Sequence, residues 1–100
     1  MAALHRNVEL PAGVELVRTT DTFTNDTVPA GLLKAHRVAA GVWGRLVVHS
    51  GRLVFVFEDQ PGRPIELAAT ETLVIPPATP HHLELDGPAT FAVEFYKIQD

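Results

Sequence analysis

Apolar residues occur along the chain in short runs, and turn-forming residues separate these runs. No stretch of about ten residues repeats its apolar positions with the helical period, so the pattern predicts an all-β domain. Clusters of Pro, Gly, Asn and Asp mark the turns between the runs. The expected strands cover residues 14–20, 32–36, 42–49, 52–58, 65–68, 72–75, 81–85 and 90–97. About eight short strands predict a jelly roll or a small Greek-key barrel.

Two of these segments carry more specific predictions. The runs on either side of Ser50-Gly51 predict a β-hairpin, because two β-rich runs joined by a glycine-containing turn commonly form one. Residues 52–58 are apolar on both faces, so this strand is expected to lie deep in the domain. In residues 81–85, His81 is in phase with the apolar Leu83, while His82 is out of phase with it. The alternation therefore points His81 inward and His82 outward.

Composition places the chain among ordinary folded proteins and excludes several functions. With 46% hydrophobic and 20% charged residues, residues 1–100 are expected to form one domain, with residues 1–10 as a loose tail. The net charge is -4 and the basic residues are scattered, so no nucleic-acid partner is expected. The chain has no cysteine, which excludes disulfides and thiolate ligands.

Neither a signal peptide nor an apolar run of about 20 residues is present, so we expect a cytoplasmic protein that does not enter the membrane. A small barrel with this apolar content has more apolar surface than its core can hide. The surplus favours a homodimer.

Several sequence runs, taken in order, carry a resemblance to a known family. These runs are Leu10-Pro11-Ala12-Gly13, Val28-Pro29-Ala30-Gly31-Leu32-Leu33-Lys34-Ala35-His36, Gly41-Val42-Trp43-Gly44-Arg45-Leu46-Val47-Val48, Ser50-Gly51, Ile75-Pro76-Pro77, Pro80-His81-His82 and Val93-Glu94-Phe95-Tyr96. Together they resemble the cupin-like domain found at the N-terminus of some tellurite-resistance TehB proteins and alone in YeaR-like proteins. The resemblance implies a single-domain cupin-type double-stranded β-helix, which is a jelly-roll barrel. It also implies a role in resistance to tellurite or to oxidative and nitrosative stress.

The methyltransferase activity of TehB resides in a separate domain with a glycine-rich cofactor loop after a strand. Nothing in this chain matches that loop, and 100 residues do not hold such a domain as well. Methyl transfer is therefore not expected here.

The resemblance also implies a metal site. Typical cupins bind a metal through two histidines and a glutamate from one strand region, plus a histidine that follows a proline-rich turn. Residues 76–81 resemble the second element and end in His81, whereas Gly44 stands where the glutamate is usual and only His36 lies upstream. We therefore expect one divalent metal ion on His36 and His81, and zinc, iron, manganese and nickel all suit such ligands. The ordinary alternative is that these histidines are hydrogen-bonded interior residues.

Three candidates remain for the third metal ligand: Glu94, His82 and a water molecule. The resemblance favours Glu94, which we take as the expected ligand. The alternation disfavours it, because Glu94 is out of phase with the apolar Val93 and Phe95. The expected function is a stress-response cupin that binds a small molecule or anion at this site. The missing glutamate and the lack of an evident catalytic acid or base leave a second hypothesis open, a non-catalytic sensor of a small anion or a partner.

Trp43 and Arg45 share one face of their expected strand. Trp43 either lines a pocket beside the histidines or packs in the core or a dimer contact, and packing is favoured. Arg45 has the geometry to clamp an oxyanion such as tellurite, nitrite or a carboxylate. More often an arginine at such a position is solvated or ion-paired.

Overall fold

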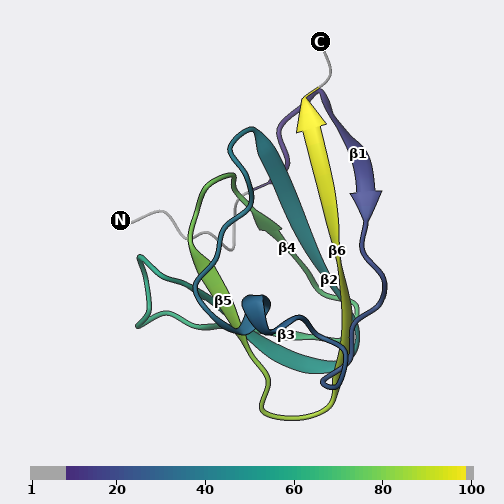
Figure 1. Cartoon of the computed structure of the whole chain (residues 1–100), viewed down its shortest axis with the longest axis vertical. Coiled ribbons are helices and arrows are strands. Elements are labelled where there is room, and N and C mark those ends of the chain that lie inside the picture. The colour runs from purple at the N-terminus through teal and green to yellow at the C-terminus, as the bar shows by residue number, and fades with distance from the viewer. Residues whose placement is uncertain (1–8, 99–100) are drawn as a thin grey trace.

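A computed structural model describes residues 9–98 of the chain, which form six strands and one short 3₁₀ helix (Figure 1). The elements are β1 (Val14–Thr19), η2 (Ala30–Leu33), β2 (Val42–Phe57), β3 (Ile65–Ala68), β4 (Thr72–Ile75), β5 (His81–Glu84) and β6 (Ala89–Ile98). One antiparallel sheet contains β1, β6, the first half of β2 and β4, and the other contains β3, the second half of β2 and β5. The predicted all-β fold is confirmed. Most of the predicted loose tail lies outside the described residues.

Strand β2 runs through both sheets without a break. Before Gly51 it pairs with β6 and β4, and after Gly51 it pairs with β3 and β5. Gly51 has a φ of 69°, in the left-handed region, and the register with β6 shifts between Val48 and Ser50. Because β6 pairs with this whole stretch, including Gly51↔Ala89, the strand bends and continues. The predicted hairpin at Ser50-Gly51 is therefore wrong. The glycine marks a bend in a continuous strand, and pairing with the distant β6 decides that a bend forms here and not a hairpin turn.

The predicted strand over residues 32–36 is also wrong. Pro29, with φ at −61°, precedes the 3₁₀ helix η2, and the N–H of Leu32 donates to the carbonyl of Pro29 over 3.0 Å. After this turn the chain makes one isolated antiparallel bridge, between His36 and His81. The proline presets the local φ, and the apolar residues after it pack as a turn of helix. The strands expected over residues 65–68 and 72–75 have the predicted bounds.

The core lies between the sheets and is built from alternate residues that face inward. Its most deeply buried large side chains are Phe55, Phe57, Phe91, Leu46, Leu53, Leu67, Leu73 and Val48. Val56, on the other face of β2, is also buried, which confirms that this part of β2 lies deep in the domain. Among the described residues, His81 is the one polar side chain that is fully buried.

Some apolar residues remain on the surface. Leu16, Val17 and Ile98 are exposed near the start of β1 and the end of β6. The homodimer stays a prediction. Across residues 9–98 there is no helix with the length and hydropathy needed to cross a membrane.

We predict that Gly51→Ala destabilises the protein by more than about 3 kcal/mol. A Cβ at this position would lie 2.0 Å from the backbone oxygen of Pro88, and the left-handed φ adds strain for any side chain. Urea unfolding measures the loss. The control Gly62→Ala, where a Cβ meets nothing within 4 Å, should change stability by less than about 1 kcal/mol. Similar urea midpoints for the two variants would contradict this account of the bend.

Candidate functional site

The backbone brings His36 and His81 directly opposite each other. The N–H of His36 donates to the carbonyl of His81 over 3.0 Å, and the N–H of His81 donates to the carbonyl of His36 over 2.8 Å. A third bond, from the N–H of Ala78 to the carbonyl of Val38, extends this pairing. Opposed residues of an antiparallel pair place their side chains on the same face. The two imidazoles are therefore neighbours because of backbone pairing.

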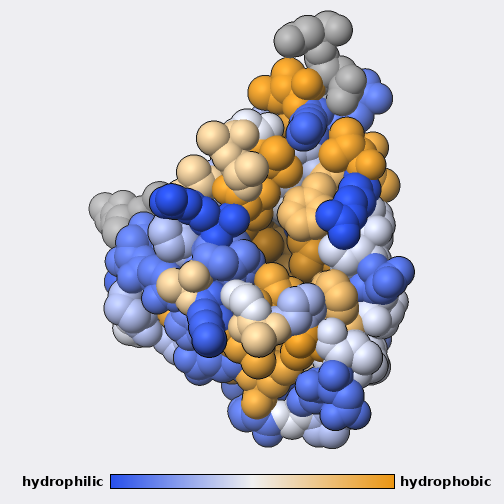
Figure 2. Space-filling model, viewed as in Figure 1, coloured by the Kyte–Doolittle hydropathy of each residue, from blue (hydrophilic) through white to orange (hydrophobic). Residues whose placement is uncertain are grey.

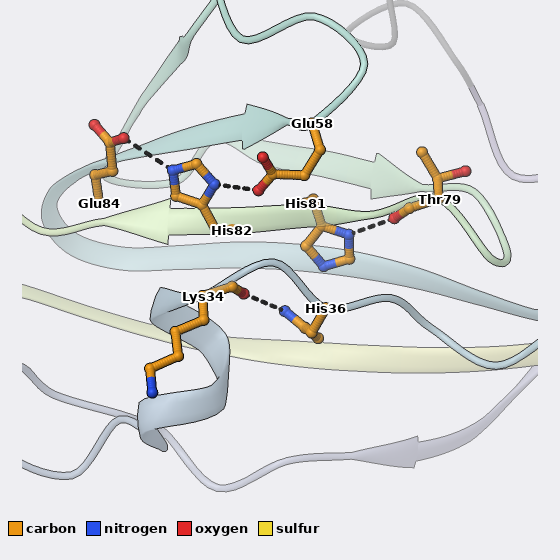
Figure 3. A network of polar contacts seen from close by, with 7 residues as sticks. All are labelled: Lys34, His36, Glu58, Thr79, His81, His82 and Glu84. Atoms are coloured by element: carbon orange, nitrogen blue, oxygen red, sulfur yellow. Dashed lines mark hydrogen bonds and ion pairs between the residues drawn. The ribbon is translucent and has the colours of Figure 1, made fainter.

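The two rings meet edge to face. Their centroids are 4.3 Å apart and their planes are inclined by 66°. Figure 3 shows His81 extending from β5 toward His36, which lies on the segment before β2. On its other side, His81 stacks on Phe55 with a centroid distance of 4.9 Å and an angle of 22°. His81 is buried and His36 is half-buried, so the pair lies at the boundary between the core and the solvent.

Each ring has its Nδ1 atom directed at a backbone carbonyl two residues earlier in the chain (Figure 3). The Nδ1 of His81 donates to the oxygen of Thr79 over 2.8 Å, and the Nδ1 of His36 lies 3.4 Å from the oxygen of Lys34. A carbonyl only accepts, so it favours the tautomer with the proton on Nδ1. The Nε2 atoms of both rings are left with lone pairs.

Burial controls the protonation of His81. Desolvation lowers the pKa of His81 from 6.5 to about 4, and this effect outweighs the hydrogen bond to Thr79, which acts in the opposite direction. The nearby His36 lowers this pKa a little further. His81 is therefore neutral at physiological pH, and its Nε2 lone pair is available.

Beside the two rings lies an apolar cavity of about 210 Å³, which Figure 2 shows as a hollow among hydrophobic residues. Its lining residues are Arg18, Thr20, Phe23, Pro29, Leu32, His36, Val38, Leu46, Phe55, Ile75, His81, Leu83, Val93 and Phe95. Neither Arg18 nor Phe95 was expected at a site from the sequence. Arg18 pairs with Phe95 across β1 and β6, and the alternation of each strand does not reveal which strands are neighbours.

Glu94 does not join the histidine pair. Its Oε1 accepts hydrogen bonds from Arg45 Nε at 2.8 Å and from Tyr96 Oη at 2.7 Å. Burial acts to raise the pKa of Glu94, but the two hydrogen bonds and the charge of Arg45 together outweigh burial and lower the pKa below its ordinary value. Burial and the bond to Glu94 raise the pKa of Tyr96. Alternation along β6 turns Glu94 away from the cavity that Val93 and Phe95 line. Arg45 is thus an ion-paired residue on that outer side.

His82 also lies apart from the cavity, as the alternation predicts. Its Nδ1 bonds to Glu58, and its Nε2 lies 2.9 Å from an oxygen of Glu84 (Figure 3). The hydrogen bonds to Glu84 and Glu58 raise the pKa of His82, despite some desolvation. Both ring nitrogens of His82 are therefore committed to carboxylates.

Trp43 and Gly44, in the first half of β2, lie apart from the histidine pair or leave no room for a ligand there. Trp43 is half-buried and pairs with Tyr96, and it is not among the cavity-lining residues. Gly44 is buried, and a Cβ placed on it would lie 3.4 Å from Ile75 and 3.5 Å from Val38. Apolar side chains thus occupy the space next to the position where a cupin glutamate is usual.

The histidine pair brings together two imidazoles, a ligand type that divalent transition metals accept. Their ring centroids are 4.3 Å apart. Within residues 9–98, no group of three His, Asp or Glu side chains lies close enough to share a metal ion. The described residues therefore provide at most two donors here, and a metal ion would need water or a ligand at its other coordination positions.

The bent strand shared by two sheets, with an interior cavity beside a histidine after a proline-rich turn, defines a cupin-type barrel. A cupin superfamily protein from Desulfitobacterium hafniense has the same fold, with a TM-score of 0.52 at 14% identity over 99% of this chain and 84% of that one. The family model of the TehB-like domain matches residues 18–93. This chain belongs to the TehB-like domain family, as its sequence resemblance indicated.

Two solved structures resemble the chain more closely. A protein from E. coli strain K12 has a TM-score of 0.84 and 24% identity over 93% of this chain and 99% of that one. TehB from Haemophilus influenzae has a TM-score of 0.75 and 19% identity over 87% of this chain, which spans only 32% of TehB. Comparison with curated proteins gave no match. At these identities the structural likenesses establish the fold alone.

We predict that wild-type protein loses stability between pH 6.5 and about 4 through a contribution that His81→Asn lacks. In this range the unfolded chain binds a proton at His81 and the folded chain does not, so stability falls as the pH falls. The contribution reaches about 3 kcal/mol at most. Asparagine keeps a donor for the Thr79 carbonyl without the titrating ring. Urea unfolding at several pH values measures the difference between the two proteins.

The control for this pH series is His82→Gln. Because the pKa of His82 is raised, its contribution is present below pH 6.5 and is lost as the pH rises through the folded value. His82→Gln should therefore keep the acid loss of stability. If wild type and His81→Asn had parallel stability profiles, the neutral buried state of His81 would be wrong.

Proposed function

We propose that this domain binds one divalent metal ion through the Nε2 atoms of His36 and His81, and binds a small molecule in the adjoining cavity. The observation that carries the proposal is the paired geometry of the two rings. They are held together by reciprocal backbone hydrogen bonds, and each directs its Nδ1 toward a carbonyl. Histidines that bind metals usually donate their other ring N–H in this way.

The electrostatics of His81 support the same proposal. A metal ion competes with protons for the imidazole lone pair, and a pKa near 4 removes that competition at neutral pH. The imidazole stacks on the ring of Phe55, an apolar contact that suits its neutral form. A bound metal would supply a Lewis acid next to the cavity, where it would polarise an oxygen atom of the small molecule. Imidazole ligands suit zinc, iron, manganese and nickel.

Family membership supports a stress-response role for this binding. The chain belongs to the TehB-like domain family. The sequence resemblance to this family implies a role in resistance to tellurite or to oxidative and nitrosative stress. The small cavity and its histidines are suited to a small molecule rather than a macromolecule.

A second candidate function is a metal-free module that binds a small anion or neutral molecule. It is favoured by the absence of a third donor among the described residues and by the packing of Ile75 and Val38 next to Gly44. In this case the Nε2 lone pairs would accept hydrogen bonds from the ligand. The two candidates differ in their response to metals.

Metal binding by the protein without an affinity tag tests the first candidate. We expect Co²⁺, Ni²⁺ or Zn²⁺ to raise the melting temperature of wild type and a chelator to reverse the change, because a ligand stabilises the state that binds it. His36→Ala and His81→Asn should each weaken binding, measured by calorimetry, by more than about tenfold, since each removes one of two protein ligands.

The matched control is His49→Ala, which removes an exposed histidine outside the cavity lining. This variant should bind metals as wild type does. A melting temperature that no metal changes, or equal metal affinity in all the variants, would reject the metal site and favour the second candidate.

A further inference from the structure

The ionisable side chains among the described lining residues of the cavity are all basic, and they bear on the charge of the ligand that it accepts. Arg18, His36 and His81 are its ionisable members among the described residues, and Thr20 adds a hydroxyl. The other described lining residues are apolar, and none of them carries a carboxylate. An anionic ligand therefore meets no like charge on this part of the wall.

The acidic side chains around the barrel are directed elsewhere. Glu94 accepts hydrogen bonds from Arg45 and Tyr96, outside the cavity. Glu58 and Glu84 bond to His82, whose side chain points to the opposite face of β5 from His81 (Figure 3). These carboxylates are thus committed to partners that do not line the cavity.

A metal ion at the histidine pair would therefore find no carboxylate among the described lining residues, and a bound anion would have to balance its charge. Imidazole ligands bring no negative charge, so the charge of a divalent ion bound there would be uncompensated, and the walls beside the pair are apolar. Holding an uncompensated charge in such surroundings is strongly unfavourable. A ligand that carries its own negative charge corrects this imbalance.

Arg18 places a positive charge at the cavity. It is exposed on β1, and its guanidinium carbon lies 5.8 Å from the centroid of the Phe95 ring, which also lines the cavity. Among the described residues, Arg18 has no carboxylate partner. A guanidinium group matches the two oxygens of a carboxylate.

The size and walls of the cavity define the rest of the ligand. An apolar cavity of about 150 Å³ accommodates benzene, and this one, at about 210 Å³, is somewhat larger. Phe23, Phe55 and Phe95 contribute aromatic rings to its wall. The space therefore suits an apolar body of about six carbon atoms with one small polar group.

From these observations we infer that the ligand is a small monocarboxylate with an apolar body, and that Arg18 selects for its negative charge. The inference rests on the histidine-pair site proposed above. Benzoate is a suitable probe, because it combines a carboxylate with a benzene ring. Benzamide, with the same shape and no charge, is its neutral counterpart.

Isothermal titration calorimetry of the protein without an affinity tag, loaded with Co²⁺ and again after chelator treatment, tests the inference. We expect the loaded protein to bind benzoate at least about tenfold more tightly than benzamide. Arg18→Gln should weaken benzoate binding about three- to tenfold and leave the affinities for benzamide and Co²⁺ unchanged. Arg52→Gln is the matched control, because it removes the same charge from an exposed position of β2 that does not line the cavity. It should leave the ratio of the two affinities unchanged.

Equal affinities of the loaded wild type for benzoate and benzamide would overturn the inference, and so would an equal effect of Arg18→Gln and Arg52→Gln. The Co²⁺ titration reports separately on the histidine pair. If wild type binds no Co²⁺, the proposed metal site fails, and the ratio measured on the chelator-treated protein decides the ligand class. A benzoate preference that Arg18→Gln removes would then uphold the inference, and equal affinities would overturn it.

Discussion

The whole barrel depends on β2 pairing in both sheets. A strand that belongs to two sheets must change direction between them, and β2 does so at Gly51, next to the backbone of Pro88. The bend lets the first half of β2 pair with β6 and β4 while the second half pairs with β3 and β5. Through β5 it also fixes the place of His81, since His81 pairs with Phe57 in the second sheet. The cavity and its histidine are thus consequences of one shared strand.

The site depends further on a short stretch of backbone that belongs to no strand. His36 reaches His81 through two reciprocal hydrogen bonds, after the 3₁₀ turn that follows Pro29. This arrangement makes the placement of the rings independent of any attraction between them. Two imidazoles in contact have little reason to associate by themselves, and desolvation further disfavours a charge on His81. The backbone holds them together at the edge of an apolar space, which is a preorganised arrangement of donors.

Most of the strands predicted from the sequence are present, but residues 32–36 form no strand and the pairing of the strands was not predicted. Period-two alternation correctly predicted that His81 points inward and His82 outward. It also predicted that Glu94 points away from the interior, where the family resemblance favoured Glu94 as a ligand, and Glu94 bonds to Arg45 on the outer side. Ser50-Gly51 has the local signal of a hairpin, and only the distant β6 decides that the chain continues. Arg18 enters the cavity lining because β1 pairs with β6, a fact that no local pattern contains. Residue faces could therefore be predicted, whereas the members of the site could not all be found.

The same alternation explains why the cavity contains no carboxylate among its described lining residues. A strand residue reaches the interior only when it is in phase with the core, and Gly44 is in phase with Leu46 and Val48. A glutamate there would have to displace Ile75 and Val38, which already pack next to the backbone. The glycine at this position and the apolar packing around it therefore go together. With no carboxylate among its described lining residues, the cavity has Arg18 as a charged side chain, and the ligand chemistry of a barrel depends on such side chains more than on the fold.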